Sequence, residues 1–301
     1  MDSFDLCCRA SEKASWLLEE EVSALHFDYS KAFLPSKICG HGLPSWLSAS
    51  EQIQINHVRA YSYAHCFFVL EQFILQETCE AAQGYVQDDR DAMSALLKFA
   101  DEETKHQRLF LWVKNELQET LGIDFQVVDG VNKLADDVCG HCSFAVFLVT
   151  LCTEWLTQRH YVECFQEENR SIDSGYQRVF RLHWTEEAQH ARIDALHLRR
   201  LASEMSDAEL AAAVEEASSI FQMLHSVVSQ QDELDVANFE ALRSKPLSPD
   251  EKASILAVFR RDSKWTFFES GLEHRAFRLI CEEILPGALA QEGVFQHALA
   301  N

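Results

Sequence analysis

The amino-acid sequence predicts an all-α protein. Apolar residues recur at spacings of three and four along nearly the whole chain, which is typical of amphipathic helices. A convincing apolar and polar alternation with period two, which would indicate strands, is absent. Only 10 Gly and 5 Pro occur among 301 residues, so helix-breaking residues are scarce and long helices can form. We expect about seven helices in total.

Three helices are predicted in the first part of the chain, over residues 11–28, 50–83 and 88–121. The first ends before a loop that is rich in Gly and Pro. The second begins near Ser50, a favourable N-cap residue that is followed by the acidic Glu51. It ends before Gly84, and the third helix ends at Gly122, because Gly is favoured just after a helix C-terminus.

Four further helices are predicted, over residues 143–168, over residues 173–205, from residue 206 onward, and over residues 248–285. An irregular stretch that contains Gly130 and Gly140 precedes the first of these. Ser206 and Glu209 have the spacing of a capping box, in which each side chain satisfies a free backbone amide of the other residue. Ser248 opens the last helix in the same way.

The strong negative charge excludes some classes of partner. The chain holds 48 acidic and 26 basic residues, for a formal charge of -22 at pH 7. Such a chain would repel a phosphate backbone, so we expect no nucleic-acid partner. The longest apolar run, residues 142–152, is too short to span a bilayer, and the acidic N-terminus is unlike a secretory signal. We therefore expect a cytoplasmic protein with no membrane partner.

Ten cysteines occur in the chain. In a reducing cytoplasm they are expected to remain thiols, so we predict no structural disulfide. Cys139 and Cys142 have the Cys-x-x-Cys spacing of redox-active pairs, but that chemistry normally follows a strand, and no strand is predicted here. The interpretation that this segment leads into a helix is therefore favoured over a redox function.

Helices two to five each carry acidic residues within an apolar stripe. In the third helix, apolar residues at steps of three and four surround Glu103 and His106, so both side chains are expected to point inward. Glu71, Glu154 and Glu187 lie in equivalent stripes of the other three helices. Burying a bare carboxylate is costly unless a cation or a proton compensates it, and Lys and Arg are nearly absent from these stripes. Metal ions are the expected compensation.

The acidic residues form a repeated motif, because a lone Glu is followed by Glu-x-x-His in both halves of the chain. The two sets are Glu71 with Glu103-Thr-Lys-His106, and Glu154 with Glu187-Ala-Gln-His190. The glutamates of the two sets are 32 and 33 residues apart, so two antiparallel hairpins would bring them to one level. This is the ligand pattern of ferritin-like bundles that bind two metal ions. The sequence therefore predicts a ferritin-like four-helix core with additional helices.

The motif of the fifth helix is longer than this general pattern. His183 lies four residues before Glu187, which gives His-x-x-x-Glu-x-x-His. This extension resembles the motif of the p-aminobenzoate N-oxygenase family. The segment 47–71, with Asn-His-Val-Arg-Ala-Tyr-Ser-Tyr-Ala-His at 56–65, resembles the second helix of the same family. The resemblance covers about residues 45–205.

The resemblance implies a di-iron oxygenase that uses O2 and an external electron donor. Its substrate would be a small amine, by analogy with the family an aromatic amine. The enzyme would oxidise this amine to a hydroxylamine or a nitro compound. Two iron ions would be the cofactor, with manganese as an alternative metal. The implied metal ligands are Glu71, Glu103, His106, Glu154, His183, Glu187 and His190.

Two other functions fit a closely related set of ligands. A di-iron hydroxylase or desaturase would attack carbon instead of nitrogen, and a ferritin-like storage protein would oxidise iron without an organic substrate. Storage ferritins are shorter single bundles, so the additional helices favour an enzyme. The resemblance implies that His183 is an additional nitrogen ligand. This extra ligand would distinguish an N-oxygenase from both alternatives.

Three further acidic residues are predicted to support the metal ligands. Glu102 and Glu186 each lie one position before a predicted ligand and so point about 100° away from it around the helix. We expect Glu102 to accept a hydrogen bond from the outer ring nitrogen of His190, and Glu186 to accept one from His106. Asp194 is an alternative partner.

No linker divides the chain, so we expect residues 1–301 to form a single domain. Its metal-binding core would span about residues 48–205. The N-terminal helix over 11–28 and the C-terminal helices over 206–285 would pack around that core. A monomer and a homodimer both remain open.

Overall fold

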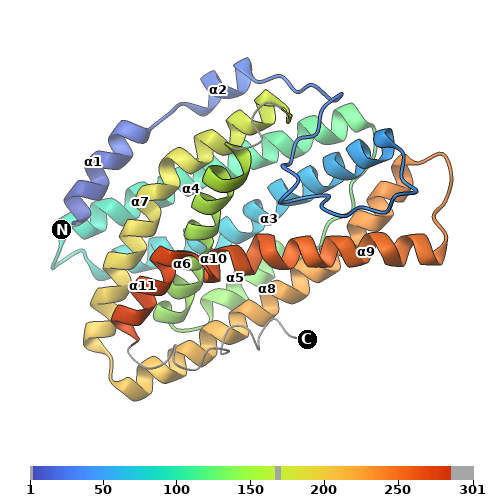
Figure 1. The fold of residues 1–301 in the computed structure, drawn as a ribbon. Coiled ribbons are helices and arrows are strands. Elements are labelled where there is room, and N and C mark those ends of the chain that lie inside the picture. The colour runs from blue at the N-terminus through green and yellow to red at the C-terminus, as the bar shows by residue number, and fades with distance from the viewer. Residues whose placement is uncertain (1–2, 167–170, 286–301) are drawn as a thin grey trace.

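The computed structural model describes residues 3–166 and 171–285 (Figure 1). The prediction of an all-α fold is confirmed, since these residues contain no strand and only one isolated bridge, between Ala32 and Ile172. Four helices form the centre of the molecule and pack against one another in pairs. They are α3 (Ala49–Gly84), α4 (Arg90–Leu121), α6 (Ser143–His160) and α7 (Ser174–Glu204).

The remaining helices pack around these four. Near the N-terminus, α1 and α2 lie along α4, and α1 also contacts α7 (Figure 1). On the C-terminal side, α8 packs against α3 and α6, and α9 packs against α8. Two π-helical turns, η1 and η2, directly follow α6 and α9. The bounds are α1 (Phe4–Ala14), α2 (Leu18–Ala24), α5 (Val131–Cys139), η1 (Tyr161–Phe165), α8 (Asp207–Leu242), α9 (Pro249–Lys264), η2 (Trp265–Glu269), α10 (Ser270–Leu272) and α11 (Arg275–Ile284).

The ends of the long helices follow the predicted capping chemistry. The capping boxes at Ser206 and Ser248 are both present. The N-cap of α3 is Ser48 instead of the predicted Ser50, because the side chain of Glu51 reaches back to Ser48 and completes a third capping box.

Several predicted helix boundaries are wrong. The predicted helix over 11–28 is divided into α1 and α2 by an extended segment around Trp16, whose side chain turns inward. The stretch with Gly130 and Gly140, expected to be irregular, contains the short helix α5 between these two glycines. The predicted helix over 248–285 is divided among α9, η2, α10 and α11. The helix predicted over 143–168 passes into η1, and its predicted end lies outside the described residues.

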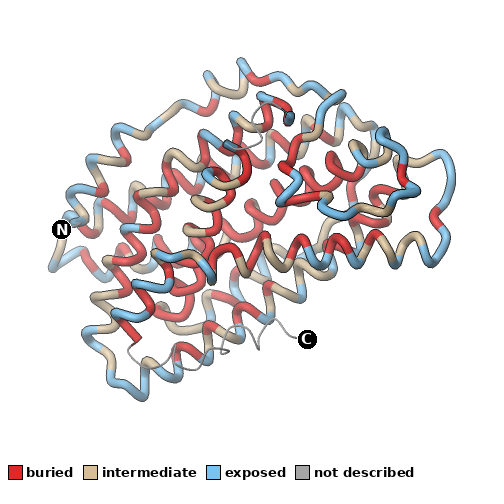
Figure 2. Tube along the Cα trace, in the orientation of Figure 1, coloured by how far each residue is buried: buried red, intermediate tan, exposed pale blue. Residues whose placement is uncertain are grey.

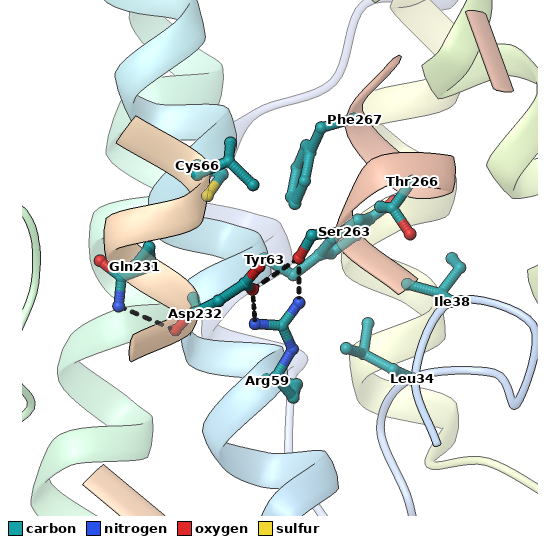
Figure 3. A pocket seen from close by; sticks show the side chains of 12 residues that line it. Leu34, Ile38, Arg59, Tyr63, Cys66, Gln231, Asp232, Ser263, Thr266 and Phe267 are labelled. Atoms are coloured by element: carbon teal, nitrogen blue, oxygen red, sulfur yellow. Dashed lines mark hydrogen bonds and ion pairs between the residues drawn. The ribbon is translucent and has the colours of Figure 1, made fainter. Parts of the chain in front are cut away.

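Buried residues run continuously through the bundle, as the red segments of the central helices in Figure 2 show. A buried ion cluster adds to this core and joins α3 to the C-terminal helices (Figure 3). The guanidinium group of Arg59 on α3 donates hydrogen bonds of 2.7 Å to both Asp232 and Asp235 on α8. It also donates to Ser263 on α9, at 2.5 Å. Because all four side chains are buried, this cluster fixes α8 and α9 against α3.

All ten cysteines are free thiols in the structure. Cys142 is the N-cap residue of α6, which agrees with the interpretation of its segment as the approach to a helix. Burial raises the pKa of Cys139 to about 12, so this thiol lacks the lowered pKa of a redox-active cysteine. Among the described helices, none combines the length and the apolar character that crossing a bilayer requires.

Candidate metal centre

The four central helices bring all seven predicted ligand residues to the middle of the bundle. None of the seven is more than 3% exposed, so water cannot screen their charges. They are Glu71 on α3, Glu103 and His106 on α4, Glu154 on α6, and His183, Glu187 and His190 on α7.

Two groups of these side chains could each hold a metal ion. In both groups one ligand atom from each residue lies within 4.8 Å of the others. The first group is Glu103, His106, Glu187 and His190, and the second is Glu71, His106 and His183. Because His106 occurs in both, the two groups are adjacent and make up one centre.

Glu187 lies at the middle of this centre. One of its oxygens is 2.9 Å from Nε2 of His183 and 3.2 Å from Nδ1 of His106. Nδ1 of His190 lies 3.6 Å from the same oxygen and 3.0 Å from Glu103. Glu154 lies at the edge, 3.9 Å from Nδ1 of His190, and belongs to neither group.

Many buried polar atoms of the centre form no hydrogen bond of normal geometry with a described residue, although several of them lie only 2.9 to 3.2 Å from another polar atom of the centre. Such unsatisfied atoms are costly in a protein interior, and several of them together indicate a site that could hold an ion. The glutamate atoms are Oε2 of Glu71, both carboxylate oxygens of Glu103, Oε2 of Glu154 and Oε1 of Glu187. The histidine atoms are Nδ1 of His106, His183 and His190. The donor set of carboxylates and imidazoles fits iron and related divalent metals.

The pKa values indicate that protons compensate the charges when metal is absent. Burial raises the pKa of Glu71 to about 8, and the nearby charge of Glu103 adds to this effect. Burial and the charge of Glu187 raise the pKa of Glu154 as well. Burial lowers the pKa of His106, but the surrounding glutamates outweigh it and hold the net pKa well above its usual value. Metal binding must displace these protons, so metal affinity should fall as the pH decreases.

The two predicted supporting hydrogen bonds are present. Nε2 of His190 donates to Glu102 at 2.7 Å, and Nε2 of His106 donates to Glu186 at 3.0 Å. Each bond turns the Nδ1 atom of its histidine toward the centre, where the lone pair can bind a metal. Asp194 is completely buried, and neither of its oxygens forms a hydrogen bond with a described residue, so it is not the partner of either ring.

Three residues that support the centre were not predicted from the sequence. Ser11 on α1 donates to Glu102, and Lys105 on α4 donates to Glu186. Trp16 stacks against the ring of His106, with the ring centroids 6.3 Å apart. Ser11 and Trp16 come from a segment far from the motifs, and no local pattern indicates their contacts. Lys105 lies inside a Glu-x-x-His motif. That position is the only feature of the sequence that could have indicated its contact with the centre.

Replacing Glu186 by Gln should weaken metal binding about 10- to 100-fold, which is the usual cost of losing a carboxylate that orients a metal-bound histidine. The measurement is anaerobic calorimetry with Fe(II) on the full chain. Glu233→Gln is the matched control, because Glu233 is exposed and pairs only with the surface residue Arg260 among the described side chains. Equal Fe(II) affinities for the two variants would contradict a supporting role of Glu186.

A helical bundle that surrounds a buried glutamate and histidine centre defines the class of ferritin-like carboxylate metalloproteins. The family model for the p-aminobenzoate N-oxygenase AurF matches residues 8–244 of the chain. The chain therefore belongs to the AurF family of ferritin-like di-iron N-oxygenases and is an enzyme. No curated protein matches the chain at a significant level.

Proposed function

We propose that this enzyme holds two iron ions with all seven buried ligand residues and uses O2 to oxidise the nitrogen of a small amine, in the first instance an aromatic amine. The observation that carries the proposal is the set of unsatisfied carboxylate and imidazole atoms between the four central helices. Membership of the AurF family supports N-oxygenation over the oxidation of carbon or of iron alone.

The charges of the centre suit two ferrous ions. Glu71, Glu103, Glu154 and Glu187 would together balance two Fe(II) ions, which leaves a buried site close to neutral. His183 would add a third nitrogen without changing that balance. Manganese, which also binds carboxylates and imidazoles, is the alternative metal.

The protein would contribute geometry and a dry environment, while bound ferrous ions would supply the electrons and the Lewis acidity that activate dioxygen. Glu102 and Glu186 would hold His190 and His106 in fixed orientations. Phe67 and Phe110 cover His183, with ring centroids 5.2 and 4.9 Å from the imidazole. These rings would exclude water from the side of the centre that holds His183.

We further propose that residues 1–301 act as a single domain around a core of about residues 48–205. Two contacts that tie the outer helices to the core support this single-domain arrangement. The hydroxyl group of Ser11 on α1 reaches Glu102 beside the centre, and Arg59 links α3 to α8 and α9. For turnover, the enzyme would take electrons from an external donor.

The function can be tested with p-aminobenzoate as the probe. Full-length protein is loaded with Fe(II) without oxygen, and then ¹⁸O2 and a chemical reductant are added. We expect mass spectrometry to detect labelled hydroxylamine or nitro product, and Glu187→Gln to give none. Carbon-hydroxylated products across a panel of amines, with no N-oxidised product, would contradict N-oxygenation and favour a hydroxylase.

A further inference from the structure

A continuous series of aromatic rings leads from the candidate metal centre toward the surface. It begins at His183, one of the predicted ligands, whose ring centroid lies 5.2 Å from that of Phe67. The ring of Tyr63, one helical turn earlier on α3, lies 5.0 Å from that of Phe67. The series continues to His160, 5.9 Å from Tyr63, and to Trp265, 5.5 Å from His160. The first four side chains are buried, whereas Trp265 is partly exposed.

Tyr63 and His160 form a polar pair inside this apolar surrounding. The hydroxyl group of Tyr63 lies 2.7 Å from Nδ1 of His160. Nε2 of the same ring lies 3.0 Å from the hydroxyl group of Ser270, which itself donates to the backbone carbonyl of Thr266. Ser270 therefore accepts from Nε2, so Nδ1 accepts from Tyr63. Burial and the charge of Arg159 lower the pKa of His160 to about 3, which keeps the ring neutral.

The series passes the place where both π-helical turns begin. His160 is the last residue of α6 before η1, and Trp265 is the first residue of η2. Tyr63 also lies beside Phe267 of η2, with the ring centroids 5.9 Å apart (Figure 3). Because π-helical turns occur frequently at functional sites, this placement favours a function for the series over core packing alone.

The hydrogen bond from Tyr63 to His160 suits a one-electron oxidation of the phenol. A phenol that loses an electron becomes a strong acid, so the oxidation needs a base within hydrogen-bond distance that takes up the proton. Nδ1 of neutral His160 is such a base. A side chain that only filled this space would need no hydroxyl group, and burying one costs free energy.

We propose that Tyr63 and Trp265 pass single electrons to the metal centre when dioxygen has reacted there without an amine. Tyr63 gives up one electron, which crosses Phe67 to the centre, and its phenolic proton moves to Nδ1 of His160. Trp265 then returns an electron to the Tyr63 radical, and His160 returns the proton to the phenolic oxygen. Ascorbate or a thiol in solution restores Trp265. The net step oxidises that reductant by one electron and reduces the centre by one.

The surroundings of Trp265 decide where its proton goes. The cations of Lys37 and Arg159 lie 5.0 and 5.6 Å from the centre of the indole ring. They disfavour a positively charged ring, so oxidised Trp265 releases its indole proton to water and takes a proton back when the reductant restores it. Both cations pair with Glu163, at 2.9 and 3.1 Å, which offsets part of their charge.

The inference rests on the proposed function, because the centre must react with dioxygen to draw the electron. The first test mixes the Fe(II)-loaded full chain with O2 and no amine. EPR spectroscopy after rapid freezing should detect a tyrosyl radical, whose spectrum changes when the protein carries tyrosine deuterated at Cβ. Tyr63→Phe should lose this signal. His160→Gln, which keeps a hydrogen-bond acceptor but removes the base, should lose it too. Trp265→Phe should keep the radical, and ascorbate should remove it several-fold more slowly.

Tyr176→Phe is the matched control. Tyr176 is completely buried, and its ring lies 5.2 Å from that of Phe180, but its hydroxyl group donates to the backbone carbonyl of Ala60 and so has no base to receive its proton. This variant should form the same radical as the unaltered protein. A radical that Tyr63→Phe retains, or that Tyr176→Phe loses, would overturn the proposal.

A second test needs no iron and separates this inference from the proposed function. In metal-free protein, a photo-oxidised ruthenium complex in solution takes an electron from the partly exposed Trp265. Tyr63 should refill it, so EPR should show the tyrosyl radical, and Trp265→Phe or Tyr63→Phe should remove that signal. This result supports the electron path even if the iron-loaded protein does not react with O2, which would count against the proposed function instead. No tyrosyl radical here, or one that Tyr63→Phe retains, would overturn the path.

Discussion

Replacing Glu187 by Gln is expected to reduce iron binding from two ions per chain to at most one, and to abolish oxidation of the amine. Glu187 lies 2.9 Å from His183 and 3.2 Å from His106, so its charge serves both candidate groups. Loss of a direct ligand should weaken binding by more than the roughly 100-fold limit that is usual for supporting residues. Elemental analysis after anaerobic loading with Fe(II) measures the effect.

Glu233→Gln is the control for this replacement as well, since it makes the same chemical change at an exposed position of α8. Circular dichroism should show that both variants keep the helical fold. Two iron ions bound to Glu187→Gln, with an affinity close to that of the control, would contradict the role of Glu187 as a ligand.

Replacing His183 by Ala should have the next largest effect. Nε2 of His183 lies 3.0 Å from Glu71 and 2.9 Å from Glu187, within the second candidate group. The first group keeps all of its residues, so one iron ion should remain bound. The second ion should bind about 100-fold more weakly or not at all, because its group loses a direct nitrogen ligand. Formation of the N-oxidised product should be lost with it.

The third buried histidine of α7 provides the control for this experiment. His197 is also buried, but its Nδ1 atom bonds to the hydroxyl group of Tyr85, and it belongs to neither candidate group. His197→Ala should destabilise the protein without changing the number of iron ions that it binds. If His183→Ala and His197→Ala both retain two ions and full product yield, His183 is a core histidine and not a ligand.

The central bundle could be predicted because its signals are local. Glu103 and His106 share a stripe with apolar residues, and that periodicity fixes which face of α4 is buried. The hydrogen bonds of Glu102 and Glu186 followed from the same helix geometry, since each glutamate is one residue before a ligand position and turns toward the neighbouring helix.

The parts that could not be predicted depend on contacts between distant segments. The break before α2 lets Trp16 stack on His106, a contact between positions 90 residues apart in the chain. The short helix α5 begins after Gly130, whose φ of 84° is a left-handed conformation that the residue type permits but does not require. The change from α9 to η2 has no marker in the sequence, because a π-helical turn differs from an α-helix only in its hydrogen-bond spacing.

The most direct test of this account is the metal stoichiometry of the unaltered enzyme. Protein freed of metal is titrated with Fe(II) in the absence of oxygen, and bound iron is measured by elemental analysis after the excess is removed. We predict two iron ions per chain, with release of protons on binding, because burial raises the pKa values of Glu71 and Glu154 and so favours their protonated forms, whereas metal binding requires the carboxylates. One zinc ion per chain, or no bound metal after this loading, would contradict the proposal that the buried glutamates and histidines form a di-iron centre.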